Sequence, residues 1–450
     1  MAQHEKFSCK SGEDLKSLAA SLGVKLPYQE DISPLGKSLE LGKWKVPNRM
    51  VIQPMEGCDG DDMGRPSELT MRRYERFARG GSGLLWMEAT AVHPDGRANP
   101  RQLQIREESL EALTEMVHRT RVAAKEAGQE NPILIVQLTH SGRYSKPDGT
   151  ARPITATENV FLDAKLTGER HIITDDELDA LQENYITAAK LAIQAGFDGV
   201  DIKSCHGYLL GELLSGYNRP GKYGGSLENR TRMIREVTKK VYQAVEGKVF
   251  IASRLNVYDG LPAPSGWGSD SDGKPDWTEP QWLIKELYER GMILIDATCG
   301  NPYYNPHINR PYDRGYYTPP VHPLENLTVL LEAAHQVKQA EPKMSVICSG
   351  LTWLRRFGGN VGAAGVAEGS YDLAGFGRQA LAYPNYAKDL LAGNWQTNQE
   401  CLTCSSCTVM MRDGGVSGCP IRDGEVYRPL FQKGREGKEA IDGSAVAYHV

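Results

Sequence analysis

Short apolar runs recur along this chain, and stretches with helical periodicity separate one run from the next. A continuous apolar run of about four to eight residues is typical of a strand that is buried on both faces. Such runs, when they alternate with helices, indicate a parallel sheet. Eight runs fit this description, at residues 51–55, 83–89, 132–138, 197–202, 248–254, 292–297, 344–349 and 371–377.

The stretches with helical periodicity include residues 67–80, 175–195 and 228–246. The second of these has well-marked ends, because Thr174 stands before three acidic residues and Gly196 follows the last turn. A hydroxyl cap and first-turn carboxylates stabilise the start of a helix, and glycine commonly follows its end. We therefore expect a regular helix over residues 175–195.

Eight strand–helix units predict an α/β fold of the (β/α)8 barrel type, also called a TIM barrel. A doubly wound sheet is the structural alternative, and such a sheet normally carries a G-x-G-x-x-G turn after its first strand. No such turn follows residues 51–55. Two long loops, 258–278 and 299–320, follow predicted strand ends, so we expect them on the catalytic face of the barrel.

The chain divides into three predicted parts. Residues 1–35 are expected to form an N-terminal arm and residues 36–394 the barrel, while residues 395–450 carry a cysteine-rich segment and a C-terminal tail. The polar tail from Phe431 onward is expected to be an arm that is mobile in part.

The composition is that of a soluble globular protein, with 450 residues, 40% hydrophobic residues, 24% charged residues and a net charge of −5. The chain has no block of basic residues, so a nucleic-acid partner is not expected. No apolar run approaches the ~20 residues that a membrane span needs, and the N-terminus lacks the apolar stretch of a signal peptide. These features predict a cytoplasmic protein whose thiols stay reduced.

Four of the nine cysteines, Cys401, Cys404, Cys407 and Cys419, follow the spacing C-x2-C-x2-C-x11-C. Three thiolates separated by two residues can reach three corners of one cluster from a single loop, and the fourth closes the cage. This pattern is typical of a [4Fe-4S] cluster. Structural zinc usually takes two separate C-x2-C pairs or a mixture of cysteine and histidine, and the segment holds no histidine. Zinc, disulfides and free thiols remain the alternatives.

Polar residues and glycines stand at the predicted strand ends, which face the active site of a barrel. They are Gln137 and His140 after the third strand, Lys203, His206 and Tyr208 after the fourth, Arg254 at the fifth, Ser349 and Gly350 after the seventh, and Gly377 and Arg378 after the eighth. An amide can pair with the edge of a heterocycle, and a polar trio can act in acid–base chemistry. Glycine-bearing loops after the last two strands, with an arginine, are typical of a phosphate site. Each histidine alone could equally be a hydrogen-bonded core residue, but together these residues predict flavin mononucleotide (FMN) across the barrel mouth.

Several segments resemble the Old Yellow Enzyme family, namely VPNRMVIQPM, EATAV-x-PDGR, QLTHSGR, HGYLLGELLSGYNRPGKYGGSLENRTR and GFGRQALAYP. With the cysteine segment added, the chain is similar to the iron–sulfur branch of that family, which contains 2,4-dienoyl-CoA reductase, enoate reductases, clostridial bile-acid reductases and trimethylamine dehydrogenase. The resemblance spans about residues 35–425.

The resemblance implies roles for individual residues. It implies that Pro54, Met55, Ala89, Gln137 and Arg254 surround the isoalloxazine and that Gly350, Gly377 and Arg378 hold the phosphate, with Ser349 beside them as a further cofactor-binding residue at the end of the seventh strand. It also implies that Tyr208 donates a proton to the substrate, that Lys203 and His206 face the substrate carbonyl, and that His307 contributes from the loop after the sixth strand.

Two positions depart from the family pattern. Lys203 stands where better-known relatives have His, Asn or Tyr, which favours a substrate with a carboxylate or a strongly polarised carbonyl. Glu56 stands where the amine dehydrogenases link their flavin through a cysteine, so we expect FMN to be bound non-covalently.

The expected activity is FMN- and [4Fe-4S]-dependent reduction of an activated C=C bond in a small-molecule α,β-unsaturated carbonyl, carboxylate or thioester. Hydride would come from flavin N5 and the proton from Tyr208. One alternative is an amine dehydrogenase or demethylase that passes electrons from FMN to the cluster, with an aromatic cage from Tyr303, Tyr304, Tyr312, Tyr316 and Tyr317. The other is an electron-transfer subunit without a substrate of its own.

Longer members of the resembled branch continue into FAD- and NADPH-binding domains, and this sequence shows no dinucleotide fingerprint after a predicted strand. We therefore expect electrons to pass through the cluster to or from a ferredoxin, a flavodoxin or a flavoprotein subunit. The rival expectation is direct reduction of FMN by NAD(P)H. We also expect the protein to form a homo-oligomer and to have no membrane partner.

Overall fold

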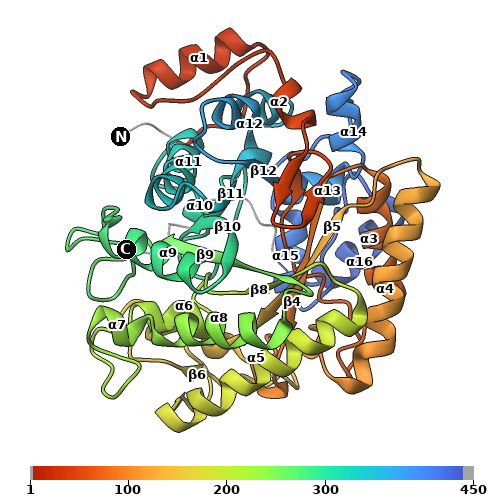
Figure 1. Ribbon diagram of the computed structural model, residues 1–450. Coiled ribbons are helices and arrows are strands. Elements are labelled where there is room, and N and C mark those ends of the chain that lie inside the picture. Colours follow the sequence, from red (N-terminus) through yellow and green to blue (C-terminus); the bar gives the residue numbers. More distant parts are fainter. Residues whose placement is uncertain (1–3, 439–450) are drawn as a thin grey trace.

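A closed barrel of eight parallel strands forms the centre of the molecule (Figure 1). This computed structural model describes residues 4–438 of the chain. In chain order the barrel strands are β3 (Met50–Ile52), β4 (Leu84–Ala91), β5 (Ile133–Thr139), β8 (Gly199–Ile202), β9 (Phe250–Tyr258), β10 (Met292–Cys299), β11 (Ser345–Cys348) and β12 (Leu373–Phe376). Each strand overlaps one of the eight apolar runs, and β12 pairs with β3 to close the ring, so the predicted (β/α)8 barrel is confirmed.

An antiparallel hairpin covers one end of the barrel. Its strands are β1 (Leu39–Leu41) and β2 (Trp44–Val46). Leu41 and Val46 share an apolar cluster with Leu84 at the start of β4, and the Trp44 ring meets the Phe250 ring edge-on with centroids 5.1 Å apart. Because Leu84 and Phe250 begin their strands, the hairpin closes the amino-terminal end of the barrel. The carboxyl-terminal end, where barrels carry their active sites, lies opposite.

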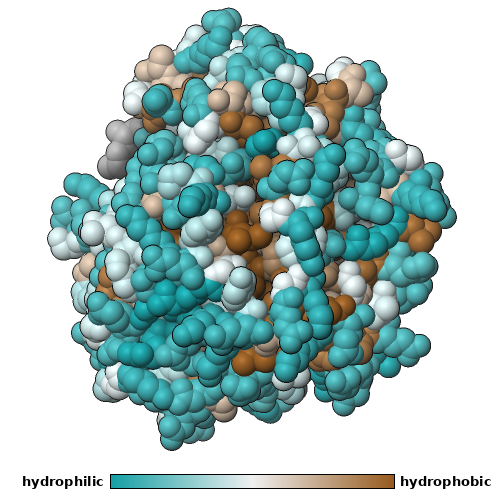
Figure 2. All heavy atoms as spheres, in the orientation of Figure 1, coloured by the Kyte–Doolittle hydropathy of each residue, from teal (hydrophilic) through white to brown (hydrophobic). Residues whose placement is uncertain are grey.

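Helices surround the barrel, and the face of the molecule in Figure 2 is mostly hydrophilic, with apolar residues gathered near its centre. The longer helices before residue 400 are α3 (Glu68–Arg79), α4 (Glu107–Glu126), α5 (Asp175–Ala195), α8 (Arg232–Val245), α9 (Thr278–Glu289), α11 (Pro323–Ala340) and α12 (Phe357–Ala367). In α8, for example, Met233, Val237 and Val241 recur every four residues and are all buried. This spacing puts them on the one helix face that packs against the barrel.

Shorter elements fill the connections. They are α6 (Leu209–Leu214), α7 (Leu227–Arg230), α10 (Pro306–Asn309), α13 (Arg378–Ala382), α14 (Tyr386–Leu391), a two-stranded pairing of β6 (Ile154–Thr155) with β7 (His171–Ile172), and 3₁₀ turns at Pro94–Gly96, Gly142–Tyr144, Asp163–Lys165 and Leu351–Leu354. The helix predicted over residues 228–246 is divided between α7 and α8 at Thr231. The Thr231 hydroxyl donates to the Leu227 carbonyl at 2.7 Å, which offers the backbone an alternative to a continuous helix.

The predicted ends of α5 are confirmed. The Thr174 hydroxyl accepts from the Glu177 backbone N–H at 3.2 Å, and the Glu177 carboxylate accepts from the Thr174 backbone N–H at 2.7 Å. This reciprocal arrangement is a capping box. Gly196 ends the helix at φ 89°, in the left-handed region that favours glycine.

The two ends of the described chain pack on the barrel. Near the N-terminus, α1 (Gly12–Ser21) and α2 (Ser33–Gly36) place Leu15 and Leu35 in the same apolar core as the barrel helices. The C-terminal segment carries α15 (Ser406–Arg412) and α16 (Gly424–Arg435). Of the predicted tail arm, residues 439–450 lie outside the described residues.

Two sets of bonds hold the C-terminal segment on the barrel. Arg72 and Arg76 of α3 both pair with Asp423, which lies just before α16. The Ser417 backbone N–H donates to the Gly57 carbonyl at 2.6 Å, in the loop after β3. No helix within residues 4–438 has both the length and the apolar character needed to cross a bilayer.

Replacing Thr174 with alanine should destabilise the protein by about 0.5–2 kcal/mol, because the Glu177 backbone N–H loses its capping partner. Thermal unfolding followed by circular dichroism would measure the loss. Thr174→Ser keeps the hydroxyl and should melt close to the wild type. Equal melting temperatures for the alanine and serine variants would contradict this role of the cap.

Candidate active site

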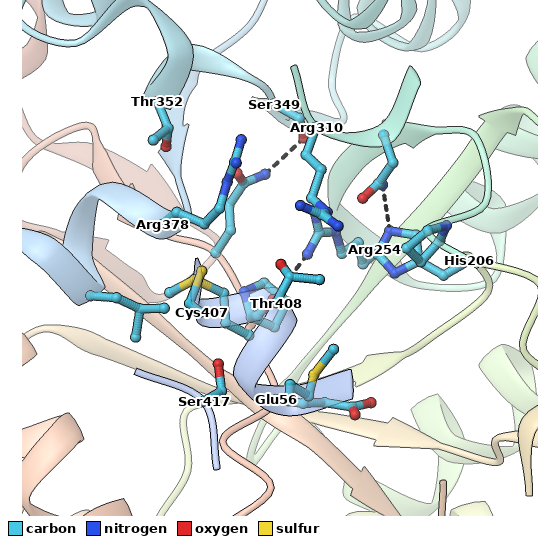
Figure 3. Close-up of a pocket in the computed structure, with 18 of the residues that line it drawn as sticks. Glu56, His206, Arg254, Arg310, Ser349, Thr352, Arg378, Cys407, Thr408 and Ser417 are labelled. Atoms are coloured by element: carbon cyan, nitrogen blue, oxygen red, sulfur yellow. Dashed lines mark hydrogen bonds between the residues drawn. The ribbon is translucent and has the colours of Figure 1, made fainter. Parts of the chain in front are cut away.

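A cavity of about 200 Å³ lies at the carboxyl-terminal ends of the barrel strands (Figure 3). Eleven of the thirteen predicted catalytic and cofactor residues line it, namely Pro54, Met55, Gln137, Lys203, His206, Tyr208, Arg254, Ser349, Gly350, Gly377 and Arg378. Residues that the sequence did not assign to the site complete the wall, among them Asn309, Arg310, Met411, Arg412 and Ser417. The barrel fold therefore gathers residues from six strand ends, and the C-terminal segment covers them.

One end of the cavity suits a phosphate group. Gly350 has φ 92°, which favours glycine, and Gly377 directly precedes Arg378 at the start of α13. The Arg378 guanidinium donates through Nη2 to the Pro311 carbonyl at 2.5 Å. Its Nη1 is buried and has no hydrogen-bond partner in the described part of the chain. A buried cationic donor without a partner is costly, so this end fits an anionic ligand such as the FMN phosphate.

Two buried carboxylates orient the side chains of Gln137 and Arg254 in the middle of the cavity. The Gln137 amide donates to Asp201 Oδ2 at 2.6 Å, which turns the amide oxygen away from that carboxylate and leaves it as an acceptor. Arg254 Nε lies 3.2 Å from Asp296 Oδ2, and its Nη1 donates to the Pro54 carbonyl at 3.1 Å. Burial raises the pKa of Asp201 to about 7 and also raises that of Asp296, while the neighbouring Arg254 lowers the latter. An amide acceptor and a guanidinium held in this way fit the polar edge of a flavin ring.

Tyr208 is the most constrained polar side chain at the substrate end of the cavity. Its hydroxyl donates to Glu56 Oε1 at 2.6 Å and lies 3.2 Å from the Tyr303 hydroxyl. Lys203 Nζ lies over the Tyr208 ring, 3.7 Å from the centroid. Burial, followed by the Glu56 charge, raises the pKa of Tyr208 well above its ordinary value, and burial lowers the pKa of Lys203. The sequence placed Glu56 near the flavin but did not connect it with Tyr208.

The hydrogen bonds of Asn309 decide the tautomer of His206. Asn309 Nδ2 lies 2.8 Å from His206 Nε2 (Figure 3), 3.1 Å from Thr298 Oγ1 and 3.3 Å from the Cys299 carbonyl oxygen. Because a carbonyl only accepts, the amide nitrogen must face Cys299, and it therefore donates to an unprotonated Nε2. The His206 proton then resides on Nδ1.

His206 is also neutral. Burial lowers its pKa well below the ordinary value, and the charges of Arg254, Lys203 and Arg310 lower it further. His206 has φ 64°, a conformation that residues with a side chain seldom adopt. A neutral Nδ1–H at this position can donate a hydrogen bond to a substrate oxygen without changing charge.

Tyr208 and Tyr303 line one wall of the cavity, and Tyr144 stacks against Tyr303. The Tyr303 and Tyr144 rings lie nearly parallel with centroids 3.7 Å apart, and the Tyr208 ring lies 6.3 Å from that of Tyr303. Of the five tyrosines in the predicted aromatic cage, only Tyr303 lines the cavity; Tyr304 lines a separate cavity, Tyr312 and Tyr317 bond to each other, and Tyr316 lies against Arg412. Tyr144 belongs to a different loop, and no motif in the sequence pointed to its packing against Tyr303.

Two predicted residues lie outside the cavity wall. Ala89 is buried in β4, and its carbonyl accepts from Gln102 at 3.3 Å. His307 is buried with Nδ1 2.5 Å from the Tyr317 hydroxyl, and burial lowers its pKa to about 4. Asn309, two residues after His307, reaches the cavity instead. The roles assigned to Ala89 and His307 stay predictions.

His140 is a hydrogen-bonded core residue, which is one of the two possibilities that the sequence allowed for it. Its Nε2 lies 3.0 Å from Asp95 Oδ1, and its Nδ1 accepts from the Gly142 backbone N–H at 3.1 Å. Both ring nitrogens are therefore engaged within the protein. His140 is buried and does not line the cavity.

The four cysteines of the C-x2-C-x2-C-x11-C segment line one small second cavity, and Cys407 lines both cavities. None of the four forms a disulfide. The Thr403 backbone N–H donates to Cys401 Sγ at 3.4 Å, and the Arg422 backbone N–H donates to Cys419 Sγ at 3.3 Å. N–H···S bonds of this kind stabilise metal-bound thiolates and tune clusters. Within residues 4–438 no three His, Cys, Asp or Glu side chains converge as ligands of a single metal ion.

Comparison with known proteins agrees with the fold. The model of the NADH:flavin oxidoreductase / NADH oxidase family matches residues 34–270. The NADPH dehydrogenase of Halalkalibacterium halodurans is 32% identical over 257 residues, which make up 56% of this chain and 69% of that protein.

Solved structures of similar shape include 2-naphthoyl-CoA reductase in complex with 2-naphthoyl-CoA, with a TM-score of 0.72 and 21% identity over 87% of this chain and 57% of that chain. Histamine dehydrogenase from Rhizobium sp. 4-9 gives a TM-score of 0.66 and 19% identity over 86% of this chain and 52% of that chain. At these identities the likeness shows the fold alone. This chain spans little more than half the length of either of these solved chains.

Replacing Arg378 with leucine should weaken FMN binding by about one to two orders of magnitude, because a charge-assisted hydrogen bond contributes ~1.5–3 kcal/mol. Fluorescence titration of the apoprotein would measure the change. Riboflavin, which lacks the phosphate, is the matched control and should bind both proteins alike. An equal loss for both ligands would contradict a phosphate contact at Arg378.

Proposed function

Because this chain belongs to the NADH:flavin oxidoreductase / NADH oxidase family and is a flavin-dependent oxidoreductase, we propose that it reduces an activated C=C bond with FMN and a [4Fe-4S] cluster. One observation carries the proposal. Tyr208, Lys203 and His206 line the same cavity as the side chains suited to holding a flavin. One small substrate in this cavity could therefore contact the proton donor, the groups that bind its carbonyl and the cofactor.

The residues of the cavity fit FMN. Arg378, Gly350 and Gly377 would hold the phosphate, and Gln137 and Arg254 would contact the ring. When bound and reduced, FMN supplies a hydride. Glu56 rather than a cysteine follows Met55, which supports a flavin bound without a covalent link.

The chain's own residues would polarise the substrate and supply a proton. Lys203 and the Nδ1–H of His206 are donors suited to a substrate carbonyl or carboxylate oxygen. Drawing electron density toward that oxygen makes the β-carbon electrophilic and favours protonation at the α-carbon. Tyr208 is the candidate donor of that proton.

The charges of the cavity favour an anionic substrate. Lys203, Arg254 and Arg310 surround His206 closely enough to lower its pKa. Arg310 Nη1 is buried and has no hydrogen-bond partner in the described residues, and burial lowers the pKa of Arg310 to about 10. A guanidinium with an unused donor selects carboxylates, so an enoate fits this site better than a cationic amine.

Two observations favour the amine dehydrogenase as a second candidate. The stacked rings of Tyr144, Tyr303 and Tyr208, with the Glu56 carboxylate beside them, are groups that attract an amine cation. The fold is also shared with histamine dehydrogenase. The surrounding lysine and arginines oppose this reading, and the substrate test below separates the two.

The four cysteines support an iron–sulfur cluster in the C-terminal segment. They share one cavity, and their C-x2-C-x2-C-x11-C spacing suits a cluster better than a single zinc ion. Since Cys407 also lines the flavin cavity, single electrons would have a short path between cluster and flavin.

The surface next to the cysteines supports a redox partner protein. Arg422 lines both the cysteine cavity and an outer cavity that also contains Arg76 and Arg79, and Ile421 between them is 44% exposed. Basic side chains around an exposed apolar residue suit an acidic electron carrier such as a ferredoxin or flavodoxin. NAD(P)H as a direct donor is the rival route.

Anaerobically purified protein should contain iron and acid-labile sulfide in equal amounts, and Cys404→Ala should lose both while keeping FMN, because it removes one of four ligands. Metal analysis and the visible spectrum measure this outcome. Cys348→Ala, in β11, removes a thiol outside the segment and should leave the iron content unchanged. Detection of zinc without sulfide would contradict the cluster and indicate a structural zinc site instead.

Photoreduced flavin should be reoxidised by an α,β-unsaturated carboxylate, while methylated amines should leave the oxidised flavin unchanged. Tyr208→Phe should slow the reoxidation by about 10²–10⁴-fold with flavin retained, because a general acid contributes on that order. Arg310→Met should weaken binding of the carboxylate but not of its methyl ester. Anaerobic stopped-flow absorbance measures all three.

Reduction of the flavin by an amine would favour the dehydrogenase. Failure of every enoate, enone, thioester and amine would favour an electron-transfer subunit without its own substrate. Either result would overturn the proposed reductase.

A further inference from the structure

We propose that Glu56 is the proton source of this site and that Tyr208 relays the proton from Glu56 to the substrate. The proposal rests on the proposed function, which supplies the reaction that consumes the proton. It assigns to Glu56 a chemical role that the sequence did not predict.

The contact between the two residues is short and joins the loops after two barrel strands, β3 and β8, that are not neighbours in the barrel. Glu56 follows β3 and Tyr208 stands just before α6, and Glu56 Oε1 accepts from the Tyr208 hydroxyl at 2.6 Å. Both residues line the cavity, Tyr208 being 2% exposed and Glu56 half-buried. A proton can therefore pass between them without leaving the site, and water can reach the outer member.

The loop that carries Glu56 is firmly held. The Gly57 backbone N–H donates to Glu88 Oε2 at 2.6 Å. Arg73 is buried between Glu88 and Asp59 and pairs with both. Because a buried ion pair is costly to break, this arrangement keeps Glu56 at hydrogen-bond distance from Tyr208.

The direction of the hydrogen bond argues against Tyr208 as the final source of the proton. In the structure the Tyr208 hydroxyl points at Glu56, so its proton is directed toward a carboxylate. Loss of that proton to a substrate would leave a phenolate beside the carboxylate. Burial and the Glu56 charge both disfavour the phenolate, since together they raise the pKa of Tyr208 well above its ordinary value.

A relay avoids the phenolate. A protonated Glu56 donates to the Tyr208 oxygen across the same contact, and Tyr208 passes its own hydrogen to the α-carbon of the substrate. One C–H bond forms at the α-carbon, the Tyr208 O–H bond breaks and is remade with the Glu56 proton, and Glu56 becomes a carboxylate. The hydride that bound, reduced FMN would supply brings the electron pair of the new C–H bond at the β-carbon, and the π pair of the C=C bond forms the C–H bond at the α-carbon. Glu56 then regains a proton from water.

Binding of an anionic substrate would prepare this relay, because a second negative charge in the cavity favours the neutral, protonated form of a carboxyl group. The groups that face Glu56 from the surrounding elements are Tyr208 before α6, Lys203 after β8, Tyr303 after β10, Glu88 and Gln102 near β4, and Cys58 in its own loop. Among these, Lys203 is the cation that opposes protonation of Glu56. An enoate that engages Lys203 weakens this opposition.

The test compares wild type with Glu56→Gln, which keeps an oxygen that can accept from Tyr208 but carries no transferable proton. Binding of an enoate to the oxidised protein should take up a proton in the wild type, measured with a pH indicator in weak buffer. Glu56→Gln should bind the enoate without that uptake, and the methyl ester should cause no uptake in either protein. This measurement involves no turnover.

Flavin reoxidation by the enoate supplies the second measurement. In the wild type its rate should depend on pH, because the proposed proton source is an ionisable group, whereas Glu56→Gln should be at least about tenfold slower and insensitive to pH over the same range. Glu126→Gln, at the exposed end of α4, is the matched control and should behave as wild type in both measurements.

A wild-type pH profile in Glu56→Gln, or unchanged proton uptake, would overturn the relay while substrate reduction itself continued. Failure of the wild type to reduce any enoate would instead overturn the proposed function. A slower Glu56→Gln that kept the wild-type pH profile would assign Glu56 a positioning role only and would also overturn the relay.

Discussion

Burial of two carboxylates, Asp201 and Asp296, constrains the polar side chains at the centre of the cavity wall. Both are fully buried, and a carboxylate removed from water must be hydrogen-bonded or paired. Asp201 accepts from Trp86, Gln137 and the backbone N–H of Arg254. Asp296 meets Arg254 and accepts from Gln53 and Ser349. Gln53, Gln137, Arg254 and Ser349 also line the cavity, so these bonds to carboxylates fix the orientation of their side chains there.

A second group of buried, paired charges lies beneath the loop after β3. Arg73 is buried and lies between Asp59 and Glu88, and Glu88 in turn holds the Gly57 backbone. The C-terminal segment rests on this loop, because the Ser417 backbone N–H donates to the Gly57 carbonyl. The carboxylate beside Tyr208 and the segment that carries the cysteines therefore share one anchor, and a displacement of the loop would disturb both.

The barrel and eleven residues of the cavity wall could be predicted from the sequence because they depend on local signals. Apolar runs mark the strands, Thr174 and Gly196 mark the ends of α5, and the ends of strands supply the wall. The remaining residues come from long loops whose course depends on tertiary contacts. Tyr303 lines the cavity with Tyr144 stacked against it, and Asn309 lines it while bonded to His206 and Thr298.

His307 illustrates why position in a loop is harder to predict than position in a strand. In a strand, side chains alternate with a period of two, so a residue's direction follows from its number. Here Pro306–Asn309 form the single turn α10, which turns His307 toward Tyr317 and Asn309 toward the cavity. The contact between Glu56 and Tyr208 escaped prediction for a related reason, since 152 residues separate the two in the sequence.

Positively charged side chains lie at all three parts of the proposed site, namely the flavin phosphate, the substrate carboxylate and the cluster. Arg310 is buried near Arg378 and Arg412, whose charges lower its pKa, and near Cys407, which raises it. Like charges held together in a protein interior repel one another unless anions lie between them. A flavin phosphate at Arg378, a carboxylate at Arg310 and cluster thiolates at Cys407 would each supply such an anion. The arginines thus favour simultaneous occupancy of all three positions, which is the state in which electrons and a proton can meet at the substrate.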